Sequence, residues 1–338
     1  RTFDGCIGLS TQDSMRLYLD DQLLIDGWGA GKSADQALDF HFEEGRPYKV
    51  RIEFVNDGRG ARVLFGCSEG REDIDAAAAL AARCDVAILC LGDNEETSGE
   101  NFDRVSLDLP GRQLALAKAV WATGTPTVLV LQSGRPVSAN WENDHLPAIL
   151  EAWFPGEQGG AAVAETLFGD NAPSGRLPIT FPRSVGQVPC HYARRPGGGK
   201  KYVEMDWMPL YPFGYGLSYT SFSYSDLTLS ADTIRADESV EATVTVTNTG
   251  DRAGVAVPQL YLHDLVSSVV KPLHQMADFA RVSLEPGESK TVRFTVGTRA
   301  LRTLGADYVW RVEPGRFEVE LGDNAENILL KAPLRVTE

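Results

Sequence analysis

The sequence predicts a multidomain chain: a partial β-sandwich module, then an α/β sandwich with a mostly parallel sheet, and last a second β-sandwich. Two observations support this order. Residues 1–69 and 211–338 contain short segments in which apolar and polar side chains alternate, the pattern of half-buried strands. Residues 70–183 instead alternate short apolar runs with helical segments, which predicts parallel strands covered by helices on both faces.

The N-terminal region, 1–69, is expected to hold about five strands. A hairpin joins 15–19 to 23–25, and 61–65 is expected to pair back onto the strand at 47–54 after a turn. No first half of a sandwich is evident in these strands, so the region is interpreted as part of such a module.

The middle region, 70–183, is expected to place polar loops at the carboxyl ends of buried strands. Cys84 and Cys90 flank or lie within the first strand and are interpreted as small core residues. Gly169 closes the last helix. The expected elements are helices at 72–83, from near Pro110 and at 159–168, and strands at 86–91, 126–132 and 148–153.

A connector at 184–210 follows, and its basic, glycine-rich part at 194–201 is typical of a solvated surface loop. From 211 to 338 about seven short strands are bounded by turn residues, which predicts an immunoglobulin-like or fibronectin type III-like sandwich. The clearest of these strands are expected at 239–248, 257–262, 291–296 and 316–321.

Composition excludes several classes of function. The 338 residues carry a net charge of -15, which argues against nucleic acid or an anionic membrane as the main partner. No apolar run reaches the roughly 18 residues of a membrane span. The five cysteines are odd in number, and neither they nor the five histidines show metal-ligand spacing, so no metal site and no cofactor are expected.

The loop at 98–104 is the most informative segment of the chain, and its central carboxylate is Glu100. It follows the apolar strand and belongs to a polar loop with five carboxylates between Asp93 and Asp103. Ligands of open α/β sheets bind at the carboxyl ends of strands. A carboxyl group among like charges tends to keep its proton, which suits a general acid. The alternative, from composition alone, is a solvated acidic loop.

Eight short segments carry a family resemblance: GENFDR at 99–104, LDLPGRQ at 107–113, VLVLQSGRPV at 128–137, AWFPGEQGG at 152–160, LFGD at 167–170, PSGRLPITFP at 173–182, YPFGYGLSYT at 211–220 and EPGESKT at 285–291. Through them the chain, from about residue 70 to its end, resembles the C-terminal half of a glycoside hydrolase family 3 enzyme of the β-glucosidase or β-xylosidase kind. Each segment alone is weak evidence, but all eight in the order of that family are a strong signal. Through segments at 10–20, 24–28 and 44–52, residues 1–69 resemble the C-terminal part of a protective-antigen-like β module, a known insertion in such enzymes.

The resemblance implies a role for Glu100 and a missing partner. Glu100 corresponds to the general acid/base of many family members, and Asp103 and Arg104 are interpreted as an ion pair that shapes the loop. The nucleophile of the family is an Asp in an N-terminal (β/α)8 barrel, which this sequence lacks. The chain is therefore expected to be a C-terminal piece, inactive alone, whose barrel is attached or supplied as a separate chain.

The implied activity is that of an exo-acting retaining β-glycosidase on the terminal non-reducing sugar of oligosaccharides or glycosides, with β-D-glucosidase favoured. Trp28 lies in a glycine-rich loop, where an exposed indole could stack on a sugar, the alternative being a Trp buried in its own sandwich. Trp153 is expected in the core. A non-catalytic carbohydrate-binding or adhesion module stays open as an alternative function. A periplasmic or secreted location is favoured over the cytoplasm, although the sequence does not decide it.

Overall fold

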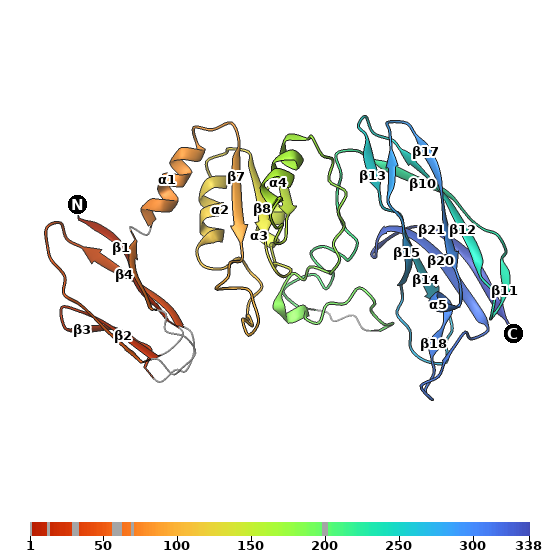
Figure 1. Cartoon of the computed structure of the whole chain (residues 1–338), viewed down its shortest axis with the longest axis horizontal. Helices are drawn as coiled ribbons and strands as arrows, with labels where there is room; N and C mark the ends of the chain where they lie inside the picture. Colours follow the sequence, from red (N-terminus) through yellow and green to blue (C-terminus); the bar gives the residue numbers. More distant parts are fainter. Residues whose placement is uncertain (1, 12–13, 29–33, 56–62, 69–70, 198–201) are drawn as a thin grey trace. The chain divides into compact units, whose positions relative to one another are not determined.

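The computed structural model of the chain describes residues 2–11, 14–28, 34–55, 63–68, 71–197 and 202–338 (Figure 1). The chain divides into two units. The first consists of residues 1–89 and 112–128, and the second of residues 90–111 and 129–338. This division runs through two strands of the α/β layer, so that the carboxyl ends of all its strands belong to the second unit. No helix in the described part of the chain is long and apolar enough to cross a membrane.

The first unit opens with a β module of two three-stranded sheets, in the orders β4-β1-β6 and β3-β2-β5. Alternate side chains of β1, β2 and β3 are buried against one another, among them Ile7, Leu9, Met15 and Leu17. The strands are β1 (Phe3–Thr11), β2 (Ser14–Leu19), β3 (Gln22–Asp26), β4 (Ala34–Phe42), β5 (Val50–Val55) and β6 (Val63–Ser68).

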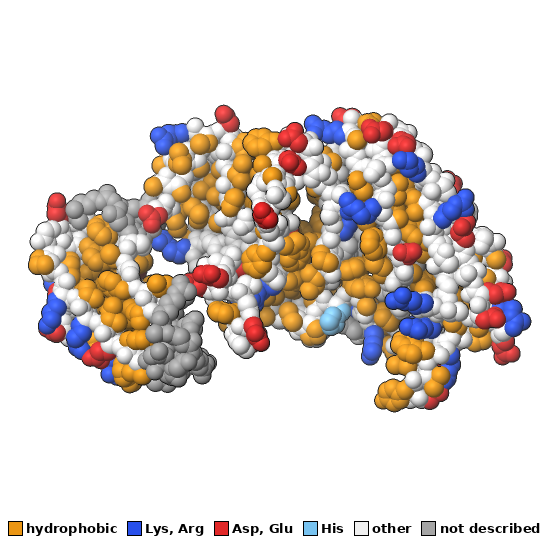
Figure 2. Space-filling model, viewed as in Figure 1, with side chains coloured by type: hydrophobic (Ala, Val, Ile, Leu, Met, Phe, Trp, Pro, Cys, Tyr) orange, Lys and Arg blue, Asp and Glu red, His pale blue; other side chains and the backbone are white. Residues whose placement is uncertain are grey.

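The hairpin between β2 and β3 is confirmed, with Leu17 opposite Ile25. The pairing predicted for the segment that includes β6 is wrong, because β6 pairs with β1, whereas β5 pairs with β2 in the other sheet. Every residue of β6 is exposed, and the strand lies at the edge of its sheet. Figure 2 shows apolar side chains gathered on the visible face of this module.

Two helices complete the first unit. The Ala-rich α1 (Arg71–Ala81) packs against α2 (Gln113–Trp121), which buries Ala117 and Val120. Thr125, just before the second strand of the α/β layer, donates a hydrogen bond from Oγ1 to the carbonyl of Ala81 at 2.9 Å.

The α/β layer contains a parallel three-stranded sheet in the order β7-β8-β9, formed by β7 (Ala87–Gly92), β8 (Thr127–Gln132) and β9 (Ala148–Glu151). The central strand β8 is almost wholly buried. β7 is an edge strand with an exposed side, so Cys90 is exposed, as is Cys84, which corrects the prediction that both are core residues. The helices are α3 (Asn140–His145), which sequence reasoning missed, and α4 (Gly159–Phe168), which ends as predicted at Gly169 with a φ of 83°.

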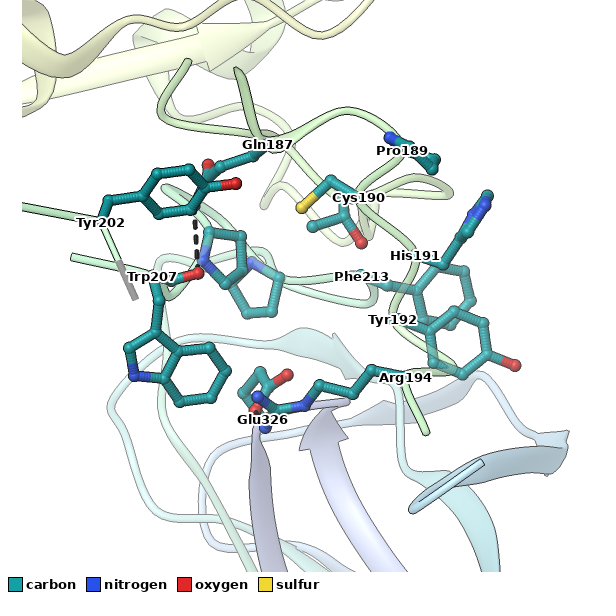
Figure 3. A pocket seen from close by; sticks show the side chains of 13 residues that line it. Gln187, Pro189, Cys190, His191, Tyr192, Arg194, Tyr202, Trp207, Phe213 and Glu326 are labelled. Atoms are coloured by element: carbon teal, nitrogen blue, oxygen red, sulfur yellow. Dashed lines mark hydrogen bonds and ion pairs between the residues drawn. The ribbon is translucent and has the colours of Figure 1, made fainter. Parts of the chain in front are cut away.

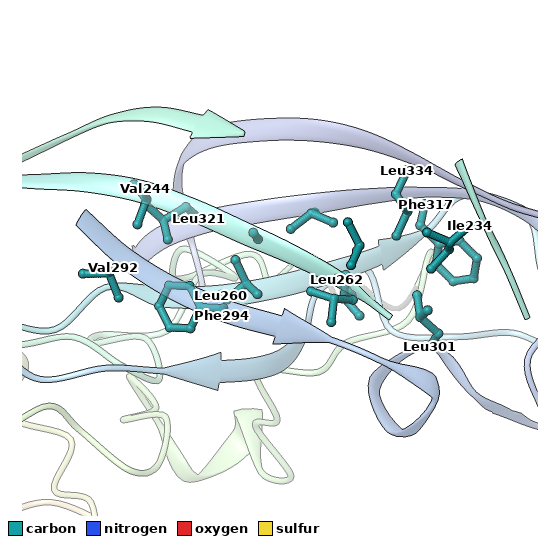
Figure 4. Packing of buried hydrophobic residues seen from close by; sticks show 14 of the residues in the cluster. Ile234, Val244, Leu260, Leu262, Val292, Phe294, Leu301, Phe317, Leu321 and Leu334 are labelled. Carbon is teal, nitrogen blue, oxygen red and sulfur yellow. The ribbon is translucent and has the colours of Figure 1, made fainter. Parts of the chain in front are cut away.

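The C-terminal sandwich has a three-stranded sheet, β10-β12-β17, and a five-stranded sheet, β11-β21-β20-β14-β15. Its core lies between them, where Val244 and Phe294 of one sheet and Leu260 and Leu321 of the other are buried (Figure 4). The elements are β10 (Phe222–Leu229), β11 (Thr233–Arg235), β12 (Val240–Asn248), β13 (Gly254–Ala256), β14 (Gln259–Asp264), β15 (Gln275–Phe279), β16 (Val282–Leu284), β17 (Ser289–Val296), α5 (Thr298–Leu301), β18 (Thr303–Leu304), β19 (Trp310–Arg311), β20 (Gly315–Asn324) and β21 (Asn327–Thr337).

The connector between the α/β layer and this sandwich has little regular structure. A short 3-10 turn at Val185–Gln187 is its one helical element among the described residues. Gln187 is buried and donates a hydrogen bond from Nε2 to the carbonyl of Trp207 at 3.0 Å, which ties the two ends of the connector together.

Candidate active site

The candidate site begins where β7 ends. Gly92 has a φ of 144°, and a Cβ on it would overlap the carbonyl of Gln132, so only glycine allows this approach to β8. The amide of Asp93 donates to the same carbonyl of Gln132 at 2.8 Å. The close approach therefore fixes Asp93 at the carboxyl end of the sheet, where a polar loop was expected.

Asp93 is the charged centre of the loop. Its side chain is fully buried and accepts a hydrogen bond on Oδ1 from Nη1 of Arg104 at 3.0 Å. Its Oδ2 lies 3.8 Å from Nε of Arg135 and has no hydrogen-bond partner among the described residues. Two guanidinium groups therefore compensate the charge of Asp93. The repulsion among the loop carboxylates that the sequence suggested is thus offset at Asp93, the buried one.

The predicted ion pair between Arg104 and Asp103 is wrong. Arg104 turns toward the buried Asp93 and also donates from Nη2 to the carbonyl of Asp108 at 2.7 Å. Asp103 is exposed and makes no ion pair among the described residues. A charge pair away from water has a stronger attraction than one on the surface, which favours the buried partner over the sequence neighbour.

Arg135 connects the charged centre to the turn that carries Glu100. Its Nη2 donates to the carbonyls of Thr97 at 3.1 Å and Phe102 at 3.2 Å. These two carbonyls stand on either side of Glu100 in the sequence. The turn also packs against the segment after β8, since a Cβ on Gly134 would contact Ser98 and the ring of Phe154.

Glu100 itself is exposed at the tip of this turn. Asn101 next to it has a φ of 65°, and the amide of Phe102 closes the turn on the carbonyl of Gly99 at 3.2 Å. Within the described ranges, the Glu100 carboxylate has no hydrogen bond or ion pair. Its position therefore depends on the backbone of the turn, and its carboxylate is accessible to a substrate.

Glu151, at the end of β9, is a site residue that sequence reasoning missed. Its carboxylate accepts hydrogen bonds from the amide of Trp153 at 2.8 Å and from Oγ of Ser133 at 3.3 Å. Burial raises the pKa of Glu151 to about 7 against the effect of these bonds, and the nearby charge of Asp93 adds to the rise. The sequence feature that could have identified Glu151 is its place as a carboxylate at the end of an otherwise apolar strand.

Trp153 follows directly and has a φ of 52°, a conformation that is costly for a residue with a Cβ. It is half-buried, with its ring edge-on to Phe181 at 5.7 Å between centroids. The hydrogen bond from its amide to Glu151 holds this strained backbone. Trp153 is thus a partly covered side chain beside the strand ends, where a fully buried one was expected.

Trp28 belongs to the first unit, and its indole is 43% exposed, so it is not buried in its own sandwich. The guanidinium of Arg16 lies over the ring, 4.8 Å from its centroid, and the Trp28 amide donates to Asp26 at 3.1 Å. One side of the indole is therefore covered by a cation, in an arrangement that holds the ring at the surface.

A cavity of about 120 Å³ is lined mainly by residues of the connector. No residue of the Glu100 turn lines it. Figure 3 shows Tyr202 on one side and Trp207, Arg194 and Glu326 on another. Arg194 pairs with Glu326 at 2.8 Å and covers the Trp207 ring at 4.4 Å. Burial raises the pKa of Glu326. The charges of Arg194 and Glu326 therefore compensate each other, while Nε of Arg194 has no hydrogen-bond partner among the described residues.

His263, Glu318 and Glu320, on adjacent strands of the C-terminal sandwich, are the one group in the described residues with donor atoms close enough for a metal ion. The ammonium of Lys331 lies 2.9 Å from Glu318 and 2.8 Å from the buried Glu320. His274 also contacts Glu320 at 2.6 Å. A protein cation already holds both carboxylates, so the arrangement is that of an ion-pair network.

Comparison with known proteins identifies two domain families in the chain. The model of the glycosyl hydrolase family 3 C-terminal domain matches residues 10–219, and that of the fibronectin type III-like domain matches residues 256–325. The second match lies within the C-terminal sandwich described above.

Known relatives extend the likeness. The periplasmic β-glucosidase of Salmonella typhimurium is 43% identical over 75% of this chain and 35% of its own length, and a β-xylosidase of Formosa agariphila is 42% identical over 77% and 37%. The solved structure of a β-glucosidase from Kluyveromyces marxianus with glucose matches all of this chain and 44% of its own, with 31% identity and a TM-score of 0.75. The chain thus spans less than half the length of the relatives it matches.

Proposed function

The chain belongs to glycoside hydrolase family 3, and from this premise we propose that it is the acid/base-bearing part of an exo-acting retaining β-glycosidase, with a β-D-glucosidase favoured. The observation that carries the proposal is the accessible Glu100 on a turn held at the carboxyl end of the α/β sheet. The named relatives are β-glucosidases and a β-xylosidase, which supports the substrate class of β-linked oligosaccharides or glycosides.

The proposed mechanism divides the chemistry between two carboxylates. A nucleophilic Asp of an N-terminal (β/α)8 barrel attacks the anomeric carbon while protonated Glu100 gives its proton to the departing oxygen. Glu100, now a carboxylate, takes a proton from the water that hydrolyses the glycosyl-enzyme, so the configuration is retained. In such enzymes the two carboxyl groups stand about 5–5.5 Å apart.

The proposed partner is therefore that barrel, attached to this chain or supplied as a separate one. The relatives support an attached domain because each is a single protein more than twice as long as the part that matches. The chain alone is expected to leave p-nitrophenyl β-glucoside intact. Hydrolysis by the pure chain, verified by its mass, would contradict the proposed division.

The decisive test is Glu100→Ala in the complete enzyme. Loss of a general acid costs about 10²–10⁴-fold in rate, so kcat on cellobiose should fall by this factor. Hydrolysis of p-nitrophenyl glycosides, whose leaving group needs no proton, should fall less in its first step, and azide should restore turnover. Asp103→Ala, an exposed carboxylate on the same loop, is the matched control and should keep near-normal kinetics. Equal losses on all substrates without azide rescue would contradict the role of Glu100.

A second candidate function is a non-catalytic carbohydrate-binding module, favoured by the exposed Trp28 indole of the β module. Calorimetric titration of the chain with cellobiose separates the two. Binding by the chain alone supports the binding module, whereas binding only when the barrel is supplied supports the enzyme.

A further inference from the structure

We propose that Arg135 is a positioning residue that holds the Glu100 turn in place, by joining the carbonyls of Thr97 and Phe102 to the buried charge of Asp93. This inference rests on the proposed function, because it concerns how the general acid/base is positioned. It gives a role to the segment after β8, which the mechanism above does not use.

The first step is the geometry of the guanidinium. Nη2 donates to the carbonyl of Thr97 at 3.1 Å and to that of Phe102 at 3.2 Å, while Nε faces Oδ2 of Asp93 at 3.8 Å. One planar group therefore connects both ends of the turn to a fixed point at the sheet. A lysine has a single nitrogen and cannot serve both directions together.

The second step is how Arg135 is itself fixed. Its carbonyl accepts a hydrogen bond from Oγ of Ser133 at 2.8 Å, and Ser133 also contacts the carboxylate of Glu151. Its side chain is only 22% exposed. The backbone before it approaches the turn so closely that a Cβ on Gly134 would meet Ser98. The backbone of Arg135 is thus held in place, so its side chain can position the Glu100 turn.

The third step is that Glu100 lacks another support. Its carboxylate has no partner in the described ranges, and residues 99–102 are closed by the backbone bond from Phe102 to Gly99. Side-chain bonds between Asn94 and Thr97 fix only the part of the loop before them. A displacement of about 1 Å in a catalytic group can cost about 10²-fold in rate. The two bonds from Arg135 therefore tie both sides of the turn to the sheet, and the Arg104–Asp93 pair holds the residue that follows it.

The first experiment measures hydrogen exchange of this chain as it stands. The amides of Ser98 and Phe102 are hydrogen-bonded within the turn, so their exchange reports its opening. In Arg135→Lys their exchange should rise about tenfold or more, since bonds from a charged donor are lost. Amides of β12 and β20 should be unchanged, which shows that the variant is folded. Unchanged exchange at Ser98 and Phe102 would overturn the inference.

The matched control is Arg183→Lys. Arg183 is also partly buried and donates from Nε to a backbone carbonyl, that of Met208, at 3.1 Å, but in the connector. It should leave exchange in the Glu100 turn unaltered. A rise equal to that in Arg135→Lys would assign the effect to general loosening and overturn the inference.

The second experiment measures kinetics of the complete enzyme. Arg135→Lys should lower kcat on cellobiose about 10–100-fold with KM nearly constant, and should lower the first step on p-nitrophenyl glucoside less. Arg183→Lys should do neither. If Glu100→Ala slows all substrates equally and azide does not restore turnover, the proposed function fails, whatever the result for Arg135→Lys. If Glu100→Ala behaves as a general acid/base variant and Arg135→Lys behaves like Arg183→Lys, only the inference on Arg135 fails.

Discussion

The C-terminal sandwich and the strand-end loop that carries Glu100 are held in place by different forces. In the sandwich, side chains such as Val244 and Phe294 are buried between two sheets, and apolar contacts hold the strands of both sheets. In the loop from 93 to 104 most side chains are at least partly exposed, and the backbone is fixed by the ionic centre of Asp93, Arg104 and Arg135.

The difference teaches that the packing of the C-terminal sandwich and the placing of the Glu100 turn are largely independent in this chain. Loss of apolar volume in the sandwich should lower the free energy of unfolding and leave the Glu100 turn as it is. Loss of a charge in the loop should disturb the turn more than the rest of the fold. The predictions below test this separation.

The largest expected effect on stability is that of Phe317→Ala. Phe317 is 2% exposed in the sandwich core, and a Phe→Ala change at such a site lowers the free energy of unfolding by about 3–5 kcal/mol. Urea denaturation measures this, and exchange at Ser98 should stay unchanged under native conditions. Phe317→Leu is the control and should cost clearly less than Phe317→Ala, because it removes less apolar volume. Faster exchange at Ser98 would show that the two regions are coupled.

Next in size is Asp93→Ala. Removal of the buried carboxylate leaves the partly buried Arg104 and Arg135 without their partner, at a cost of about 3 kcal/mol. The matched control, Asp103→Ala, removes an exposed carboxylate of the same loop and should change stability by about 0.5 kcal/mol or less. Equal costs for the two variants would show that the ionic centre does not hold the loop.

A smaller effect that depends on pH is expected at Glu151. Its pKa rises from 4.5 to about 7 on folding, so between these values the folded chain keeps a proton that the unfolded chain releases. Stability from this group is complete below about pH 4.5 and is lost as the pH rises through 7. Glu151→Gln, which stays neutral, should be more stable than the natural chain by about 1–3 kcal/mol at pH 8 and similar to it near pH 4.

Unfolding midpoints from pH 4 to pH 8 check this prediction. Glu157→Gln, at an exposed site, is the control and should track the natural chain at every pH. A constant difference between Glu151→Gln and the natural chain over the whole range would show that Glu151 does not keep its proton on folding.

The sequence predicted elements better than contacts. The alternation at 239–248 and the apolar run at 126–132 appear as β12 and β8, because a period of two and a short apolar run are local properties of the sequence. The partner of β6 was predicted wrongly, because strand pairing depends on the packing of two sheets, which a local turn signal does not contain.

The contacts of the candidate site were predicted poorly for the same reason, because they join residues that are distant in the sequence. Glu100 could be proposed from its segment, whereas Asp93 as the partner of Arg104 could not, since adjacency in the sequence suggested Asp103. Glu151 and Arg135 come from the ends of other strands, and only the sheet brings them beside the loop. Burial, which raises the pKa of Glu151, is a property of the assembled layer.

The smallest effect on stability is expected for Trp28→Ala, which tests whether an exposed aromatic of the β module serves the substrate. The stacked Arg16 contributes about 0.5–1 kcal/mol, so stability should hardly change. If Trp28 stacks on the substrate, as the sequence suggested, KM of the complete enzyme on cellobiose should rise several-fold with kcat kept. Trp310→Ala is the matched control, because Trp310 is also exposed and lies under Arg302 at 4.5 Å, but in the C-terminal sandwich. A KM that stays constant in both variants, or rises equally in both, would remove Trp28 from the site and leave Glu100 as the one residue of this chain proposed to touch the sugar.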